Sequence, residues 1–265
     1  MDKGMAQFLD MSERVIVVTG GAQGIGWGIV CTFLIEGGTV LCVDLVKPDE
    51  KAVADLGSCR DRLHYVDMDI SDPELVAEFF NRIEGDFGKV DVLVNNAGVM
   101  HKATIESMDC DKWDKVVKVN LTGPMLMARA AIPLMKKQSW GRIMNIASTQ
   151  AFIGTKTYGA YAASKAGMVG LTRVLAAELV GDNITVNTVC SSFARTPMIN
   201  ASVDALAKSS GVSREEALAQ FVTQCPQKRL IEPEEIGHVL VFLASDMARG
   251  ITGQIILVNG GRFMR

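Results

Sequence analysis

Short apolar runs alternate with longer amphipathic stretches along most of the chain. RVIVVT (14–19) and TVLCVD (39–44) are rich in β-branched residues, as buried strands are. Further runs of this kind lie at 62–70, 90–98, 141–148, 183–189 and 253–258. Strands that are apolar at nearly every position are buried on both faces. The pattern therefore predicts a parallel sheet covered by helices on both sides.

Helical periodicity fills the segments between these runs. The predicted helices follow the first strand, begin after a cap at Asp72, span about 110–137, and begin near Tyr158 and at Pro233. About seven such βα units form one doubly wound (Rossmann) α/β fold. No Pro/Ser-rich linker or repeat divides the chain, so we expect a single domain over 1–265. Within it, 1–12 is expected to be a flexible lead-in and about 199–226 a helical substrate lid.

The composition narrows the function classes. Charged residues make up 22% of the chain and the net charge is −3, so nothing indicates binding to nucleic acid or to an anionic membrane. The apolar runs are too short to span a bilayer, and the first residues lack the apolar core of a signal peptide. The six cysteines are scattered without metal-ligand spacing, which fits reduced thiols in a cytoplasmic protein without a metal site.

A glycine-rich turn, TGGAQGIG (19–26), directly follows the first predicted strand and opens a helix. That context is typical of a dinucleotide site, where backbone N–H groups at a helix N-terminus approach a pyrophosphate. The turn contains Gly20, Gln23, Gly24, Ile25 and Gly26. Its Gly-x₃-Gly-x-Gly spacing differs from the usual G-x-G-x-x-G, so an ordinary glycine turn is the alternative.

Two acidic residues extend this hypothesis. Asp44 ends the second predicted strand, where a carboxylate accepts hydrogen bonds from the adenosine ribose and repels a 2′-phosphate. No arginine adjoins it, so we expect NAD rather than NADP; the alternative is a solvated strand end. Asp69, with Ile70 beside it, is expected near the adenine edge, although such an aspartate could simply start a turn.

Four motifs in order now make a specific set. They are TGGAQGIG, NNAG (95–98), Ser148 in NIAST, and YAASK (161–165). The set resembles the classical short-chain dehydrogenase/reductase family from about 13 to 261, with Asn120 at that family's fourth catalytic position. The resemblance implies catalytic residues Asn120, Ser148, Tyr161 and Lys165. It implies cofactor contacts at Gly20, Gln23, Gly24, Ile25, Gly26, Asp44, Asp69, Ile70, Asn96, Ala97, Gly98, Tyr161, Lys165 and Thr196.

The implied roles are chemically coherent. A hydride moves between a carbinol carbon and the nicotinamide while Tyr161 exchanges a proton with the oxygen. Lys165, one helical turn on, would lower the pKa of Tyr161 and bind the nicotinamide ribose. Ser148 would donate to the substrate oxygen, and Asn120 would hold a water for proton relay. Taken singly, these residues could instead be an ordinary helix tyrosine, a surface lysine, a strand-end hydroxyl and a mid-helix irregularity.

The sequence departs from the family's usual pattern in two places. Ser191 and Ser192 stand where the family usually has Pro-Gly, so either the loop is more mobile or a serine hydroxyl makes a new contact. Thr196 keeps its usual position. Asn259 stands where the family often has Asp.

The substrate is less defined. We expect it to be contacted by Ser148, Gln150, Tyr158, Tyr161, Met100 and Met198. Members that oxidise 3-hydroxybutyrate hold its carboxylate with a cluster of polar and basic groups. In this chain the corresponding positions are occupied by Met100, Gln150 and Tyr158, which do not form such a cluster, so a small hydroxy acid is disfavoured. The C-terminal end resembles the polyol and sugar-alcohol dehydrogenases, so a polyol or sugar derivative is expected.

Several alternatives stay open at this point. Within enzymes, the alternative is a 3-oxoacyl or 3-hydroxy-acid reductase; outside them, it is an NAD-binding sensor or scaffold. Arg262 and Arg265 either lie in a solvated tail or reach an anionic group, in this subunit or in a neighbouring one. The family resemblance also implies a homotetramer or homodimer.

Overall fold

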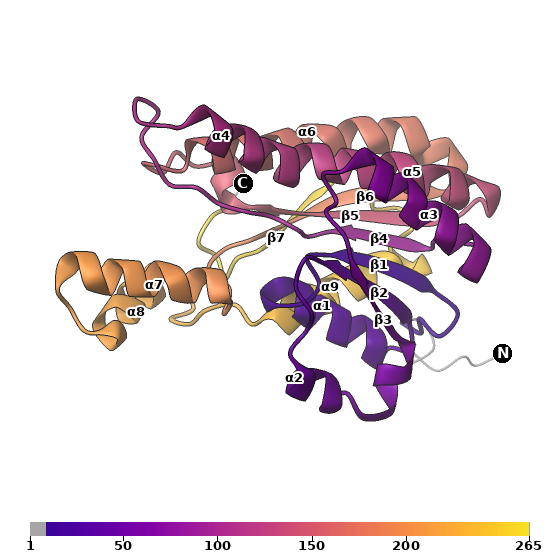
Figure 1. Cartoon of the computed structure of the whole chain (residues 1–265), viewed down its shortest axis with the longest axis horizontal. Helices are drawn as coiled ribbons and strands as arrows, with labels where there is room; N and C mark the ends of the chain where they lie inside the picture. The colour runs from indigo at the N-terminus through magenta and orange to yellow at the C-terminus, as the bar shows by residue number, and fades with distance from the viewer. Residues whose placement is uncertain (1–8, 265) are drawn as a thin grey trace.

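Seven parallel strands form one sheet in the computed structural model, which describes residues 9–264 (Figure 1). The strands are β1 (Val15–Thr19), β2 (Thr39–Asp44), β3 (Leu63–Asp67), β4 (Val92–Asn95), β5 (Gly141–Ser148), β6 (Ile184–Ser191) and β7 (Ile255–Val258). Their spatial order is β3-β2-β1-β4-β5-β6-β7. The expected single doubly wound domain is confirmed, and its strand order reverses between β1 and β4.

Helices cover both faces of this sheet (Figure 1). One face carries α3 (Pro73–Phe87), α4 (Cys110–Val117), α5 (Gly123–Lys137) and α6 (Gly159–Leu179). The other carries α1 (Gly24–Ile35), α2 (Glu50–Ala54) and α9 (Pro233–Ala244). The remaining helices, α7 (Pro197–Ser210) and α8 (Arg214–Thr223), project away from the sheet as a pair.

Strand β1 shows why both faces need cover. Val15 and Val17 pack into the core beneath α3, α5 and α6, whereas Ile16 and Val18 pack into the core beneath α1 and α9. Side chains alternate between faces along a strand, so an unbroken apolar run supplies two cores at once.

The observed elements differ from expectation in three places. The helix expected over 110–137 is divided by a π-helical segment, Lys118–Thr122, which holds Asn120. The short helix α2 was not expected. Most of the predicted lead-in, 1–12, lies outside the described residues, but Met11 is 1% exposed and its N–H donates to the Glu36 carbonyl. The chain is therefore already anchored to the domain at Met11.

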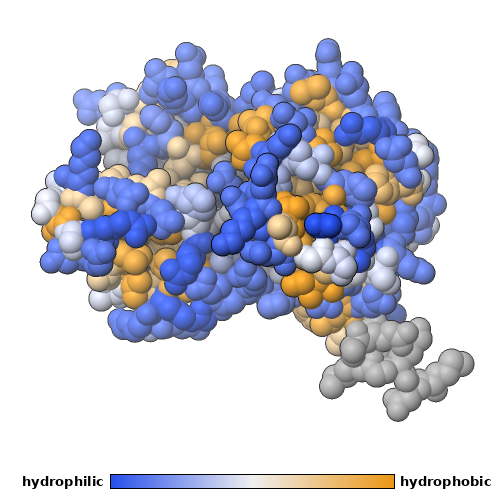
Figure 2. Space-filling model, turned by 60° about the horizontal axis from the view of Figure 1, so that its bottom comes forward, coloured by the Kyte–Doolittle hydropathy of each residue, from blue (hydrophilic) through white to orange (hydrophobic). Residues whose placement is uncertain are grey.

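On the face shown in Figure 2, hydrophobic residues form scattered patches among hydrophilic ones. Within residues 9–264, no helix is both long and apolar enough to cross a membrane.

Candidate active site

The glycine-rich turn joins β1 to α1 at the point where the strand order reverses. A Cβ on Gly20 would lie 2.7 Å from the Ala97 Cα, and one on Gly26 would overlap the Gly20 carbonyl oxygen. Gly24 has a φ of +56°, a conformation that side chains disfavour. The glycines therefore allow the turn to press against the end of β4.

The N-terminus of α1 fits an anionic group. Gln23 occupies the cap position, makes no side-chain cap hydrogen bond, and no acidic residue lies in the first turn. The backbone N–H groups of this turn thus lack the usual side-chain acceptor. A pyrophosphate satisfies such donors and is favoured by the helix dipole, so the turn fits a dinucleotide.

The segment after β4 is tied to this turn. Asn96 donates from Nδ2 to the Thr19 and Gly20 carbonyls at 2.9 and 2.8 Å. The N–H groups of Asn96 and Ala97 both donate to the Thr19 hydroxyl. Asn96 and Ala97 therefore hold together the two loops that border the crevice.

Asp44 lies at the carboxyl end of β2 with its carboxylate fixed by backbone donors. Oδ2 accepts from the Ala22 N–H at 3.0 Å, and Oδ1 accepts from the Leu45 and Val46 N–H groups at 2.8 and 3.3 Å. Asp44 thus directs a negative charge toward the edge of the glycine-rich turn.

Asp69 forms a turn, the simpler of its two expected roles. Strand β3 ends at Asp67, and Asp69 Oδ1 accepts from both the N–H and the hydroxyl of Ser71. Ile70 is 4% exposed and lies against Gly123 in α5. An adenine contact by Asp69 and Ile70 stays a prediction.

Ser148, Tyr161 and Lys165 meet at the carboxyl end of β5. Ser148 ends the strand, and α6 presents Tyr161 and Lys165 on successive turns. Lys165 Nζ donates to the Ile146 carbonyl at 2.7 Å and lies 5.8 Å from the centre of the Tyr161 ring. The predicted proximity of tyrosine, lysine and serine is therefore present in the fold.

Burial acts on the ionisation of Tyr161 and Lys165 in opposite directions. It raises the pKa of Tyr161 to about 12, in contrast to the expectation that Lys165 lowers it, and a hydrogen bond with the Ser148 side chain opposes the rise in part. Burial lowers the pKa of Lys165 to about 8. Because burial disfavours whichever form is charged, the phenol is held neutral and the ammonium becomes easier to deprotonate.

Asn120 sits in the π-helical segment between α4 and α5 and is completely buried. Its Oδ1 accepts from the Val99 N–H at 2.8 Å, and its Nδ2 donates to the Val99 carbonyl and the Ser164 hydroxyl. Ser164 in turn donates to the Tyr161 carbonyl. Asn120 therefore links the loop after β4 to the helix that carries Tyr161.

Gly98 marks the point where these groups converge. A Cβ there would lie 3.4 Å from Asn120 Oδ1 and 3.6 Å from Lys165 Nζ. Asn120 and Lys165 thus face the same small space beside the loop after β4. A side chain at position 98 would occupy it.

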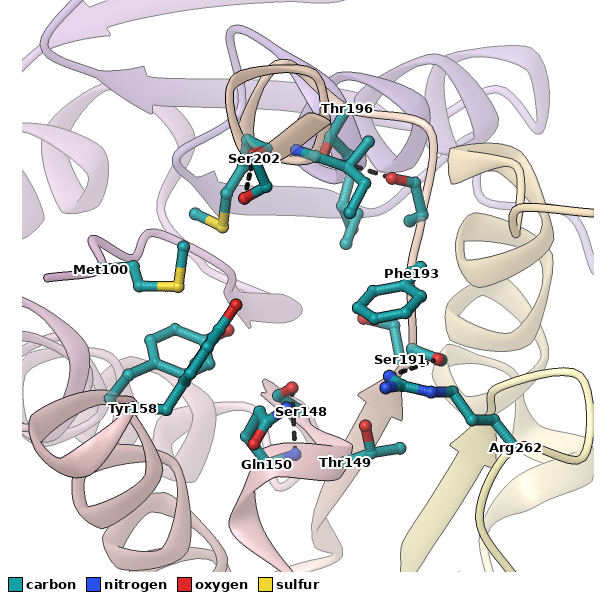
Figure 3. Close-up of a pocket in the computed structure, with 16 residues that line it drawn as sticks. Met100, Ser148, Thr149, Gln150, Tyr158, Ser191, Phe193, Thr196, Ser202 and Arg262 are labelled. Atoms are coloured by element: carbon teal, nitrogen blue, oxygen red, sulfur yellow. Dashed lines mark hydrogen bonds between the residues drawn. The ribbon is translucent and has the colours of Figure 1, made fainter. Parts of the chain in front are cut away.

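Ser148 and Tyr161 line a cavity that is partly open to solvent, and its empty space, with the open solvent included, is about 610 Å³ (Figure 3). The six residues expected to contact substrate all line it, as does Thr196. Sequence reasoning assigned no substrate contact to Thr149 or Phe193, and it included Ile199 and Ser202 only as part of the predicted lid, about 199–226.

Arg262 also lines the cavity, although the sequence left open whether it lies in a solvated tail. Its Nη1 donates to the Ser192 hydroxyl at 3.3 Å, so this serine makes a new contact at the position where Pro-Gly is usual. Thr196 caps α7, accepting from the Ile199 N–H. Arg265 lies outside the described residues.

Comparisons with known proteins agree with this geometry. Residues 20–262 match the family model described as Enoyl-(Acyl carrier protein) reductase. The chain is 38% identical to the uncharacterized oxidoreductase YxjF of Bacillus subtilis, covering 95% of this chain and 98% of that protein. It is 34% identical to a D-beta-hydroxybutyrate dehydrogenase of Cupriavidus necator, with the same coverage. It is 35% identical to the 3-oxoacyl-[acyl-carrier-protein] reductase FabG of Thermotoga maritima, again over 95% and 98%. With the ordered motifs folded into one site and matches along nearly its whole length, the chain belongs to the short-chain dehydrogenase/reductase family of oxidoreductases.

Proposed function

We propose that this protein interconverts a secondary alcohol and a ketone with NAD(H), in the cavity over Ser148 and Tyr161. The observation that carries the proposal is the convergence of Ser148, Tyr161 and Lys165 at one end of a cavity bordered by a dinucleotide-type turn. The nicotinamide ring supplies or receives the hydride. The protein provides an acid/base, an oxyanion donor and orientation.

Tyr161 is the proposed acid/base. In alcohol oxidation the phenolate takes the hydroxyl proton, and in ketone reduction the phenol returns it. Burial opposes formation of the Tyr161 phenolate, and the positive charge of the nearby Lys165 ammonium stabilises it. Lys165 Nζ also lies beside Gly98, next to the loop after β4, where it is placed to bind the cofactor ribose. Ser148 donates to the substrate oxygen as negative charge develops there.

Asn120 is proposed as a positioning residue with a part in proton relay. Both of its Nδ2 donors are used by Val99 and Ser164, so a relayed water would bind Oδ1 or a backbone carbonyl of the π-helical segment. π-helical turns release backbone carbonyls and occur often at functional sites. Such a water would connect Lys165 to solvent.

The proposed cofactor preference is NAD over NADP. The 2′-phosphate of NADP would be repelled by the Asp44 carboxylate, which backbone N–H groups hold in place. The next residues, Leu45 and Val46, supply no positive charge to offset this repulsion. We expect Asp44→Asn to lower the ratio of kcat/KM with NAD to that with NADP by about a hundredfold, because removing a like charge is worth several kcal/mol.

Initial rates with both cofactors check this expectation. Glu50→Gln, an exposed change of equal charge in α2, is the control and should leave the ratio unaltered. A wild-type enzyme that works better with NADP would show that Asp44 does not select the cofactor.

The proposed substrate class is a polyol or sugar derivative, with Gln150 and Tyr158 as hydrogen-bonding groups. A 3-hydroxy acid or its ketone is the second candidate, favoured by the presence of Arg262 in the cavity and by a relative named for hydroxybutyrate. A panel of polyols, hydroxy acids and hydroxysteroids, assayed for NADH formation, separates these candidates. Tight NAD binding without turnover of any of them would favour a sensor.

We also propose a homotetramer or homodimer. Helix α6 lies on the same outer layer as α5 (Figure 1). Val174 within α6 and Val180 directly after it are 54% and 62% accessible in the single chain. A second copy would cover such apolar side chains. Elution as a monomer in size-exclusion chromatography with light scattering would contradict this assembly.

A further inference from the structure

The C-terminal segment turns back from β7 into the cavity. Gly260 and Gly261 have φ values of +60° and +78°, which allow the sharp reversal after Asn259. Asn259 fixes this turn from both sides of its amide: Nδ2 donates to the Phe263 carbonyl at 2.7 Å, and Oδ1 accepts from the Gly261 N–H at 3.0 Å. An aspartate at position 259 would lack the donor to Phe263.

Aromatic packing holds the turn against the site. The Phe263 ring stacks on Phe152, with ring centres 5.5 Å apart and planes within 4°. Phe152 follows the short 3₁₀ segment that contains Gln150. Arg262, between the Asn259 turn and Phe263, therefore enters the cavity from the side of Ser192 (Figure 3).

The Arg262 guanidinium is fixed in orientation without being neutralised. It lies 3.8 Å from the centre of the Phe193 ring, and it donates to Ser192 and, from Nη2, to the Gln224 side chain at 3.2 Å. Within residues 9–264, no carboxylate forms an ion pair with it, and no other charged side chain lines the cavity. Neutral partners use two of its five donors, which leaves three for a ligand.

Gln150 provides a second, independent sign of a ligand at this place. Its side chain lines the same cavity, the residue is 8% exposed, and its buried Oε1 has no hydrogen-bond partner in the described structure. Leaving a buried acceptor unpaired is costly, so a hydroxyl of a bound molecule is its natural partner.

We propose that Arg262 binds a carboxylate on the substrate, so that of the two candidate classes the cavity takes the second, a short hydroxy acid, with a further hydroxyl at Gln150 in a sugar-acid type of molecule. The inference rests on the proposed function and names its substrate class. A planar guanidinium on an aromatic ring matches one carboxylate in a bidentate pair. One cation in an otherwise uncharged cavity balances a single negative charge, which favours a carboxylate over a phosphate dianion.

The kinetic test compares hydroxy acids with their uncharged amides, which have the same carbon skeleton. We expect wild-type kcat/KM to favour the acid, and Arg262→Gln to lower kcat/KM for the acid by about a hundredfold or more while the amide changes little. Arg262→Lys keeps the positive charge but cannot form the bidentate pair, so its kcat/KM for the acid should lie between the values of wild type and Arg262→Gln. Arg249→Gln, a change of equal charge at an exposed residue outside the cavity, should behave as wild type.

A binding test makes the inference independent of turnover. Malonate and inorganic phosphate are titrated by calorimetry into the enzyme–NADH complex of wild type and of each variant. We expect malonate to bind wild type and Arg249→Gln more tightly than phosphate does, and to lose its affinity in Arg262→Gln. Retained NADH affinity shows that the variant is folded.

The two tests separate failure of the inference from failure of the proposed function. Equal kcat/KM for acid and amide, malonate binding that survives Arg262→Gln, or tighter binding of phosphate would each overturn the carboxylate site. Malonate binding that depends on Arg262, without oxidation of any alcohol, would support the anion site and reject the dehydrogenase function.

Discussion

Tyr161→Phe is expected to reduce turnover by about a thousandfold or more in both directions, because it removes the hydroxyl proposed to exchange the proton with the substrate oxygen. The substitution removes one oxygen and leaves the ring that packs against Tyr158, with ring centres 6.4 Å apart. The fold and the glycine-rich turn should therefore be unaffected. The measurement is kcat with the best substrate of the panel, together with NADH affinity by fluorescence titration.

Tyr158→Phe is the matched control. Tyr158 lies at the start of α6 and lines the cavity, so loss of its hydroxyl should change KM across substrates more than kcat. Tyr161→Phe with near wild-type turnover would falsify the assignment of the acid/base. Equal losses of kcat in both variants would show that the two hydroxyls share the task.

Lys165→Met is expected to have the second largest effect, a loss of about two to three orders of magnitude in kcat/KM, since it removes the charge that stabilises the phenolate. The expectation includes a pH dependence. Burial lowers the pKa of Lys165 to about 8, so the ammonium is present below that pH and is lost as the pH rises through it. Wild-type kcat/KM for ketone reduction should therefore fall as the pH rises above about 8.

The Lys165→Met variant shows whether Lys165 or another titrating group causes the fall in kcat/KM. The residual activity of Lys165→Met should lack the fall near pH 8, because methionine has no proton to lose. Rates between pH 6 and 10, within the range in which Tyr161 keeps its proton, provide the comparison. If the same fall persisted in Lys165→Met, another group would control it.

Much of the fold could be predicted because hydrophobic periodicity reports burial directly. Strands β2 and β5 begin and end at the predicted residues, and the cap at Asp72 accepts from the Glu74 and Leu75 N–H groups as expected. The π-helical segment at Asn120 could be raised only as an alternative, a mid-helix irregularity, because a short π-helical turn hardly alters an apolar pattern. The short helix α2 buries none of its residues and so leaves no such pattern.

The residues of the candidate site were likewise predictable only in part. Ser148, Tyr161 and Lys165 come from one strand end and the helix after it, so local spacing was enough to bring them together. Arg262 reaches the cavity only because Phe263 stacks on Phe152 and Asn259 closes the turn. Contacts between residues more than a hundred positions apart carry no periodic signal, so the sequence left open whether Arg262 reaches the cavity.

The most direct test of the account mixes enzyme and NAD with the panel of secondary alcohols and follows the absorbance of NADH while the ketone is quantified. We predict NADH and ketone in equal amounts from at least one hydroxylated substrate with wild-type enzyme, and neither from Tyr161→Phe. An enzyme that binds NAD tightly but forms no NADH from any alcohol, or equal NADH from Tyr161→Phe, would contradict it.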